Sequence, residues 1–253
     1  MLRRVTIADN LARVRDQIAA AIDRRGPGPA VTLIGVGKKQ PVSALAAALA
    51  AGLRDLGENY AQEFAAKHGD PSLIGPADPV DPAGPAGLAT FTPRWHFIGG
   101  LQSNKARLVV GRALIHTVDR SSLVTALAAR ARALACTQEI LVEVNLAGEA
   151  QKAGVAPDAL PALLDAISRE AGVLRCVGLM LIPPADDDPE RARPHFAALR
   201  ELAARGAGGR PHVDLRELSM GMSGDFPVAI AEGATMIRIG TAIFGARPGP
   251  TPA

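Results

Sequence analysis

Short apolar runs and Ala-rich stretches of helical periodicity alternate along this chain, and this alternation limits the folds open to it. Eight of the apolar runs have the length and composition of buried strands. They are Val31–Gly37, Leu53–Gly57, Trp95–Gly99, Leu114–Val118, Ile140–Asn145, Cys176–Ile182, Glu217–Met220 and Met236–Ile239. Strands that alternate with helices pair in parallel, and eight such units favour closure. We therefore predict a single-domain α/β fold, a (β/α)8 TIM-like barrel.

The stretches between the runs predict helices. The clearest are Val42–Ala51, Leu123–Ala135, Pro157–Ala171 and Pro189–Ala204. A further N-terminal helix precedes the first strand, in Ala8–Gly26, with Asp9 or Asn10 as its expected cap and Gly26 as its stop. An open doubly wound sheet is the alternative fold, but the G-x-G-x-x-G fingerprint is missing after the first strand.

Two segments break the alternation. Gly69–Arg94 is dense in Pro and Gly and has no sustained period, which predicts a surface insertion on the barrel. The tail at 247–253 predicts a loose end. Since neither reads as a domain boundary, we expect one domain over residues 1–253.

Composition and charge exclude several classes of protein. The net charge is only +3 and no long Lys/Arg block is present, so we expect no nucleic-acid partner. No apolar run reaches the roughly eighteen residues of a membrane span, and no signal peptide is recognisable, so we expect a cytoplasmic protein without a membrane partner. Cys136 and Cys176 lie in no metal or redox spacing, and no His/Cys cluster suggests a metal.

The first predicted strand ends on two lysines, in the sequence VGKKQP. In a barrel the active site lies at the C-terminal ends of the strands. Because adjacent strand residues point to opposite faces, at most one of Lys38 and Lys39 faces the barrel axis. A lysine that loses part of its hydration there is more easily neutral, and a neutral amine attacks aldehydes. The spacing alone does not select between them, and two ordinary surface lysines are the alternative.

An anion site is expected after the last two strands. The sequence SMGMSGD, Ser219–Asp225, offers two hydroxyls and flexible glycines, and GTAIFG, Gly240–Gly245, places Thr241 at the start of a final helix. The alternative is that these residues only cap helices. A phosphate site facing a reactive amine would hold a phosphorylated aldehyde, for which pyridoxal 5'-phosphate (PLP) is the obvious candidate.

Three further polar residues interrupt apolar strands. If Ile237 and Ile239 face outward, the guanidinium of Arg238 faces inward, where either a pyridine nitrogen or the carboxylate of Glu143 could accept from it. His96 and His116 are expected to be hydrogen-bonded histidines of the core.

Together, VGKKQP, GENYAQE, WHFIGGLQSNK, LSMGMSGD and RIGTAIFG resemble the motifs of the pyridoxal-phosphate homeostasis proteins, which are single-domain relatives of the alanine racemase barrel. The resemblance runs from about Val5 to Arg247. It implies that Lys38 holds PLP as a Schiff base and that Arg238 faces the pyridine nitrogen. It also implies that Asn59 lies close to the ring and that the phosphate is held by Ser219, Ser223, Gly240 and Thr241. In two departures, Gly37 replaces a common Ser, which we expect to loosen the strand end, and the insertion is longer than usual.

Two functions are compatible with this resemblance. The first is a non-catalytic carrier of PLP that acts in intracellular PLP homeostasis and affects amino-acid and keto-acid balance. The alternative is a PLP-dependent amino-acid racemase, which needs two bases; the only tyrosine, Tyr60, is expected to be a wall of the pocket. A permanently cationic Arg238 also disfavours carbanion chemistry at the ring. We therefore expect a carrier without catalytic residues, monomeric, with PLP-dependent apoenzymes and free amino acids as further partners.

Overall fold

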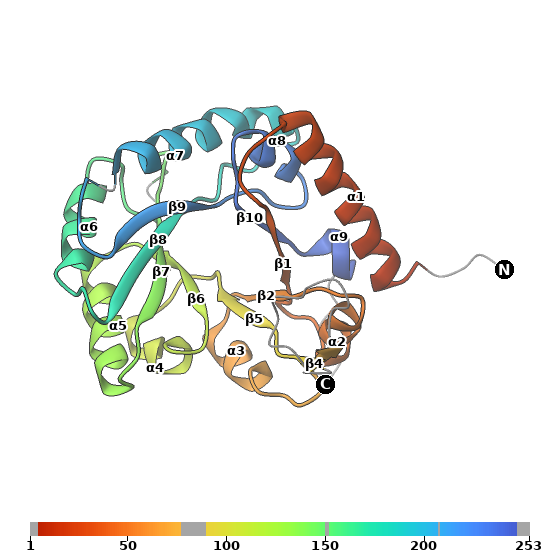
Figure 1. Ribbon diagram of the computed structural model, residues 1–253, viewed down its shortest axis with the longest axis horizontal. Coiled ribbons are helices and arrows are strands. Elements are labelled where there is room, and N and C mark those ends of the chain that lie inside the picture. Colours follow the sequence, from red (N-terminus) through yellow and green to blue (C-terminus); the bar gives the residue numbers. More distant parts are fainter. Residues whose placement is uncertain (1–4, 77–89, 150–151, 207, 247–253) are drawn as a thin grey trace.

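Eight parallel strands close into a barrel in the order β1-β10-β9-β8-β7-β6-β5-β2 (Figure 1). The structure is a computed structural model that describes residues 5–76, 90–149, 152–206 and 208–246. The barrel strands are β1 Thr32–Val36, β2 Asp55–Glu58, β5 Arg94–Phe97, β6 Leu114–Val118, β7 Gln138–Glu143, β8 Leu174–Met180, β9 Val213–Ser219 and β10 Met236–Ile239. Each overlaps one predicted run, so the predicted barrel is confirmed.

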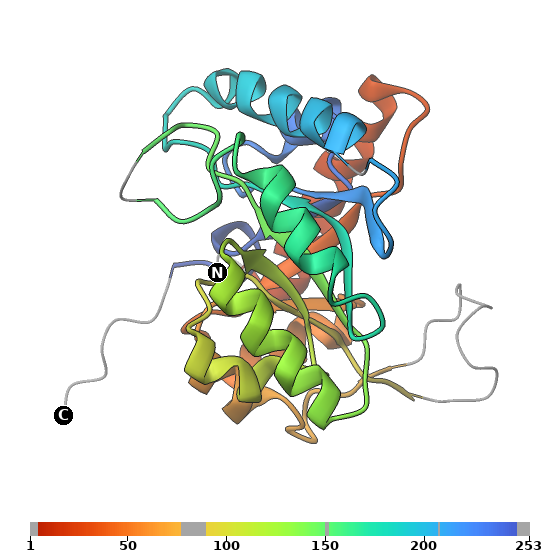
Figure 2. The same cartoon turned by 90° about the vertical axis from the view of Figure 1, so that its left-hand side faces the viewer.

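Helices follow the strands and lie outside the barrel, as two perpendicular views show (Figures 1 and 2). They are α1 Ile7–Arg25, α2 Val42–Ala50, α3 Ala61–Lys67, α4 Ala106–Val109, α5 Ser121–Ala133, α6 Leu160–Ser168, α7 Arg193–Gly206, α8 Phe226–Ala231 and α9 Thr241–Phe244, with 3-10 turns η1 Ser103–Lys105 and η2 Pro189–Ala192. The predicted helix at Pro189–Ala204 is divided between η2 and α7. Pro194 accounts for the division, because proline is accommodated in the first turn of an α-helix but not in its interior.

The N-terminal helix α1 packs against α2, α8 and α9. Its N-cap is Thr6 and not Asp9 or Asn10 as predicted. Thr6 Oγ1 accepts from the backbone of Asp9, and the Asp9 carboxylate accepts from the Thr6 backbone, which forms a reciprocal capping box. Gly26 ends the helix with a positive φ of 77°, as predicted. The sequence analysis missed this threonine because it began the helix at Ala8 and assigned Asp9 or Asn10 as the cap, although Thr6 and Asp9 have the spacing of a capping box.

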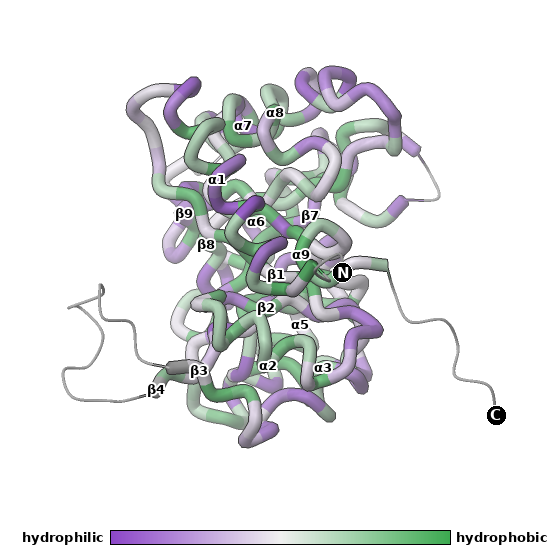
Figure 3. The backbone as a smooth tube through the Cα atoms, turned by 90° about the vertical axis from the view of Figure 1, so that its right-hand side faces the viewer, coloured by the Kyte–Doolittle hydropathy of each residue, from purple (hydrophilic) through white to green (hydrophobic). Residues whose placement is uncertain are grey.

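The barrel has two apolar cores. The larger lies between the strands and the surrounding helices, where hydrophobic segments face one another (Figure 3). The smaller lies within the barrel and consists of Ile34, Leu141, Val177, Met180 and Met236. Polar side chains fill much of the remaining interior, and they belong to the site described below.

The predicted insertion contains a short antiparallel ladder of β3 (Gly75–Pro76) and β4 (Thr90–Phe91). The guanidinium carbon of Arg54 lies 3.8 Å from the ring centroid of Phe91, a cation–π contact that ties this ladder to the barrel. The remainder of the insertion at 77–89 and the tail at 247–253 lie outside the described residues. Within the described parts of the chain, no helix combines the length and apolar character that a membrane crossing requires.

Candidate functional site

The two lysines that follow β1 differ in their exposure. Ile34 belongs to the interior cluster, whereas a Cβ at Gly35 would meet the side chain of Leu53 outside the barrel. Lys38 and Lys39 lie beyond the strand, in a turn that the Gln40 N–H closes onto Gly37 O and in which Lys39 has a positive φ of 59°. Lys38 is half-buried and Lys39 is exposed.

The turn after β1 is fixed by a buried lysine. The side chain of Lys67 is only 7% exposed, and its Nζ donates to Gly37 O at 2.8 Å, to Glu58 Oε1 at 2.7 Å and to Glu63 Oε1 at 2.8 Å. Glu63 Oε1 also accepts from the backbone N–H of Lys39 at 2.7 Å. The turn that carries Lys38 and Lys39 is therefore held from α3, by residues to which the sequence analysis gave no role.

Gly37 does not loosen the strand end as expected. Its N–H donates to Gly57 O, and its carbonyl accepts from the N–H of Gln40, each at 2.9 Å. A Cβ at this position would lie 2.9 Å from Glu58 Oε1 and 3.1 Å from Leu45. The close packing of Glu58 therefore accounts for a glycine here.

A cavity of about 250 Å³ lies at the C-terminal ends of the neighbouring strands β2, β5, β6, β7 and the segment after β8. Its lining includes Asn59, Glu143 and Lys152. Asn59 Oδ1 is buried and has no hydrogen-bond partner among the described residues, so this acceptor is available to a ligand. Burial raises the pKa of Glu143 to about 7, and the nearby Asp119 acts in the same direction.

Ser223 and Thr241 meet at the ends of two adjacent strands. Thr241 Oγ1 donates to Ser223 Oγ at 3.4 Å, which joins the loop after β9 to the start of α9. Gly240 directly precedes Thr241 and is the N-cap of α9. Gly221 has a φ of 95°, and a Cβ there would lie 2.7 Å from Ala229 Cβ, so the loop requires glycine at that position. The structure thus brings together three of the four residues expected at the phosphate.

Ser219, the fourth, lies elsewhere. It is completely buried within the barrel, where its Oγ accepts from Arg238 Nη1 at 2.7 Å and lies 2.8 Å from His116 Nδ1. Its hydroxyl is therefore engaged with the interior side chains and not with those of Ser223 and Thr241.

The guanidinium of Arg238 faces the interior, as predicted, and the residue is 4% exposed. Ile237 and Ile239 belong to the outer core. Besides Ser219, Leu181 O accepts from Arg238 Nη2 at 2.9 Å. No ion pair within 4.0 Å joins Arg238 to Glu143 in the described chain, so the predicted alternative partner is not in contact. Burial lowers the pKa of Arg238 to about 10, which leaves it cationic at neutral pH.

His96 and His116 are buried and hydrogen-bonded, as predicted. His96 Nδ1 lies 3.0 Å from His116 Nε2, and His96 Nε2 lies 2.9 Å from Asp55 Oδ1. Arg94 donates to both oxygens of Asp55, each at 2.9 Å. The sequence analysis placed both histidines in the core through their alternation with apolar neighbours. It missed their connection to Ser219 and Asp55, because pairing between strands brings those residues together.

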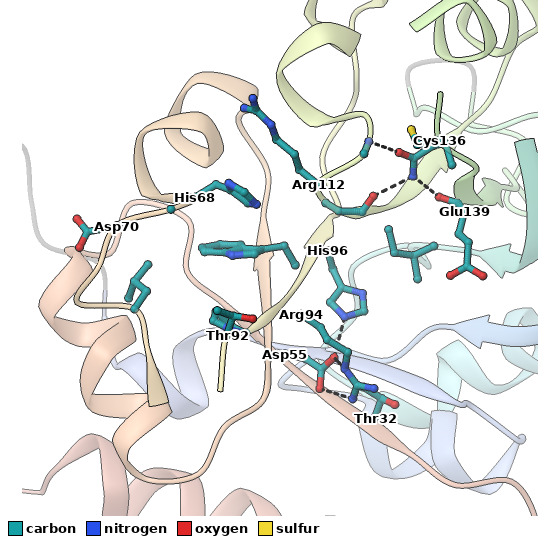
Figure 4. Close-up of a pocket in the computed structure, with 18 of the residues that line it drawn as sticks. Thr32, Asp55, His68, Asp70, Thr92, Arg94, His96, Arg112, Cys136 and Glu139 are labelled. Atoms are coloured by element: carbon teal, nitrogen blue, oxygen red, sulfur yellow. Dashed lines mark hydrogen bonds and ion pairs between the residues drawn. The ribbon is translucent and has the colours of Figure 1, made fainter. Parts of the chain in front are cut away.

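This interior chain ends at a second cavity, of about 830 Å³, on the face opposite the lysine turn (Figure 4). Asp55, Arg94 and His96 form part of its lining, and Figure 4 shows His96 and Arg94 directed at the carboxylate of Asp55. Described residues of the insertion, among them Ile74 and Thr92, line the same cavity. The described part of the insertion therefore lies near the N-terminal ends of the strands, away from Lys38.

Neither a metal site nor a disulfide is found in the described residues. No group of three or more His, Cys, Asp or Glu side chains there could hold a metal ion. Cys136 and Cys176 are free thiols, and burial raises the pKa of Cys176 to about 12, which leaves its thiol protonated and unreactive.

Comparisons with known proteins cover almost the whole chain. A family model for the alanine racemase N-terminal domain matches residues 9–248. The pyridoxal phosphate homeostasis protein of Pseudomonas aeruginosa is 42% identical over 252 residues, which are 98% of this chain and 99% of the relative. The pyridoxal phosphate homeostasis protein of Escherichia coli (strain K12) is 42% identical over 246 residues, with 95% and 97% covered.

Solved structures agree. PipY of Synechococcus elongatus, solved without PLP and with PLP bound, is 37% identical in both cases, with TM-scores of 0.77 and 0.76. Each comparison covers 95% of this chain and 100% of PipY. An alanine racemase from Streptomyces lavendulae shares the fold, with a TM-score of 0.65 at 19% identity and with 96% of this chain and 58% of the racemase covered. The chain therefore belongs to the alanine racemase N-terminal domain family and, within it, to the pyridoxal phosphate homeostasis proteins.

Proposed function

We propose that this chain carries PLP as a Schiff base on Lys38 and acts in intracellular PLP homeostasis, with effects on amino-acid and keto-acid balance. The observation that carries the proposal is a half-buried lysine in the turn directly after β1, the strand that pairs with β10 and places Ile34 opposite Arg238. Relatives with 42% identity are named pyridoxal phosphate homeostasis proteins, and PipY has been solved with PLP bound.

The residues at the mouth fit such a cofactor. Asn59 Oδ1 is a buried acceptor without a partner among the described residues, which suits the phenolic hydroxyl of the ring. The hydroxyls of Ser223 and Thr241 converge from adjacent loops and suit a phosphate. Arg238 retains N–H groups beyond the two that bond Ser219 and Leu181, and these suit the ring nitrogen.

A carrier without catalytic residues follows from the charge at Arg238. When bound, PLP supplies an aldehyde and a ring that can withdraw electrons once its nitrogen is protonated. The buried guanidinium opposes that protonation, since two cations would share one poorly hydrated site. Arg238 thus favours storage of the cofactor over its use. In this role PLP-dependent apoenzymes and free amino acids are the proposed further partners, and the carrier itself is proposed to be a monomer.

One observation favours the alternative, an amino-acid racemase. Glu143 lines the cavity at the barrel mouth, and burial raises its pKa to about 7, so it could both give and take a proton near neutral pH. Incubation of the PLP-loaded protein with L-alanine, followed by chiral analysis, separates the two functions. A carrier forms D-alanine only in traces, whereas turnover of about 1 per second or faster would establish the racemase.

Borohydride reduction and peptide mass spectrometry test the carrier directly. In the wild-type protein we expect a pyridoxyl group on the peptide that contains Lys38. Lys38→Ala should abolish this trapping and the visible absorbance, whereas Lys39→Ala, a matched change one residue away, should retain both. Trapping that survives Lys38→Ala and is lost in Lys39→Ala would overturn the assignment.

A further inference from the structure

A continuous line of polar side chains crosses the barrel interior between two arginines. Arg238 lies at the end near the lysine turn, and Arg94 lies at the opposite face. The four residues between them, here called the interior relay, are Ser219, His116, His96 and Asp55. Every link measures between 2.7 and 3.0 Å, which is the range of well-formed hydrogen bonds.

The groups at the two ends of the relay fix the direction in which its hydrogen bonds are donated. A guanidinium donates and cannot accept, so Ser219 Oγ must be the acceptor from Arg238. At the other end both oxygens of Asp55 accept from Arg94, and the pKa of this carboxyl is lowered by its hydrogen bonds to His96 and Arg94, which outweigh burial. Asp55 is therefore a carboxylate, and His96 Nε2 must carry the hydrogen that it accepts.

The remaining hydrogens then follow in sequence. A neutral His96 has no hydrogen on Nδ1, so His116 Nε2 must donate to it. A neutral His116 likewise has a bare Nδ1, which accepts the hydroxyl hydrogen of Ser219. Every hydrogen along this line is donated once, and Asp55 Oδ1 accepts from both His96 and Arg94. Any other order needs an extra proton on one of the two imidazoles.

The surroundings oppose that extra proton. His116 is completely buried, and it faces His96 and the guanidinium of Arg238. Burial holds the pKa of His116 well below its usual range, and the positive charge of Arg238 acts in the same direction. His96 is also buried. A proton added to His116 would place a second cation near Arg238 with little water to screen it.

We propose that the interior relay positions the Arg238 guanidinium through this single order of donors and acceptors, with both imidazoles neutral and protonated on Nε2. Ser219 is then a positioning residue for Arg238 and not a phosphate ligand, because its only hydrogen is committed to His116. The proposal rests on the proposed function only in that Arg238 is the residue assigned to the ring nitrogen of PLP. Asp55, at the far end, sets the direction of the whole line.

Long-range ¹H–¹⁵N correlation spectra of the PLP-free protein test the hydrogen order itself. His96 and His116 should both show protonated Nε2 and bare Nδ1 at neutral pH. Protonation of Nδ1 on either buried ring would overturn the proposal. Because this measurement needs no cofactor, it tests the hydrogen order independently of whether the protein binds PLP.

The effect on Arg238 is tested through Ser219. In the wild-type protein a held guanidinium should give separate Nη1 and Nη2 resonances, and Ser219→Ala should merge them, while Ser219→Thr should keep them apart. Separate resonances in Ser219→Ala would show that the relay does not position Arg238.

Measurement of PLP retention tests whether the relay matters for cofactor binding. His116→Phe should weaken PLP retention by about tenfold or more, because Ser219 loses the acceptor that orients its hydroxyl. His68→Phe is the matched control, since His68 packs against Phe64 and Trp95 outside the barrel. Equal retention by the two variants would contradict the positioning role. If the His116→Phe protein does not fold, Ser219→Ala against Ser219→Thr gives the same comparison.

Discussion

The serine and threonine hydroxyls of the two C-terminal loops differ in how far their neighbours leave them free to bind a ligand. Ser223 and Thr241 have hydroxyls directed at each other across two loops, whereas the hydroxyl of Ser219 is used up inside the barrel. A phosphate bound at the proposed site would compete with the long 3.4 Å contact between Ser223 and Thr241 and replace it with charge-assisted bonds. The affinity for PLP should therefore depend on Thr241 directly.

Thr241→Val is the corresponding prediction. It preserves the shape of the side chain and removes the hydroxyl, so PLP should be retained about tenfold less tightly, as expected for one lost bond to a charged group. Retention is measured by equilibrium dialysis at fixed salt. Thr137→Val is the control, because Thr137 lines the cavity on the opposite face. Equal losses in both variants would argue against a phosphate at α9.

At the scale of elements, α3 acts as a support for the end of β1. Its last residue, Lys67, reaches back to Gly37 O and to two carboxylates, while Glu63 from the same helix accepts from the backbone of Lys39. The turn that displays Lys38 is thus fastened on its outer side by a helix from the next βα unit. These contacts come from α3 and do not involve the side chain of Lys38, which they leave available to a ligand.

Lys67→Met should therefore weaken both the fold and the site. Breaking a buried ion pair by removing one partner costs about 3–5 kcal/mol, because Glu58 would remain buried without its cation. The free energy of unfolding in urea gives the loss, and the rate of borohydride-trapped labelling of Lys38 should fall with it. Glu58→Gln added to Lys67→Met should recover part of the stability. Lys105→Met, at a partly exposed site outside this cluster, should change stability by no more than about 0.5 kcal/mol.

The sequence predicted the secondary-structure elements better than the contacts between their side chains. All eight strands and the inward direction of Arg238 followed from apolar alternation, because the period of a strand is local. The Thr6 cap is a local Thr-x-x-Asp pattern that the sequence analysis overlooked, whereas the Lys67 cluster depends on partners that tertiary packing brings together. Ser219 was grouped with Ser223 through their shared loop motif. Its pairing with Arg238 and His116 arises only when strands β6, β9 and β10 close the barrel.

For the whole molecule, the barrel interior is both a core and an electrostatic site. Its apolar cluster is small, and charged groups share the remaining space with it. Glu143 is 6% exposed, and its carboxylate has a pKa raised to about 7, against an ordinary value of 4.5. The folded state therefore binds this proton more tightly than the unfolded chain does. Folding stability gained from Glu143 is present at low pH and is lost as the pH rises from about 4.5 to 7.

Glu143→Gln should remove this part of the pH dependence. In the PLP-free protein, the variant and the wild type should have similar unfolding free energies near pH 5, and the variant should be more stable by up to about 3 kcal/mol at pH 8. Urea unfolding at both pH values measures the difference. Glu139→Gln, an exposed position on the same strand, should show no such pH-dependent gain. A gain of equal size at pH 5 and pH 8 would rule out titration of Glu143 as its cause.

The hydrogen-bonded link from Arg238 to Asp55 also predicts where loss-of-function substitutions should occur. In a screen for cells that mishandle vitamin B6, the expected hits around Lys38 should be joined by substitutions of Asp55 or Arg94, on the far side of the molecule and beside the larger cavity. Because Asp55 is a buried partner of Arg94 and His96, such alleles would lower the stability of the fold together with the retention of PLP.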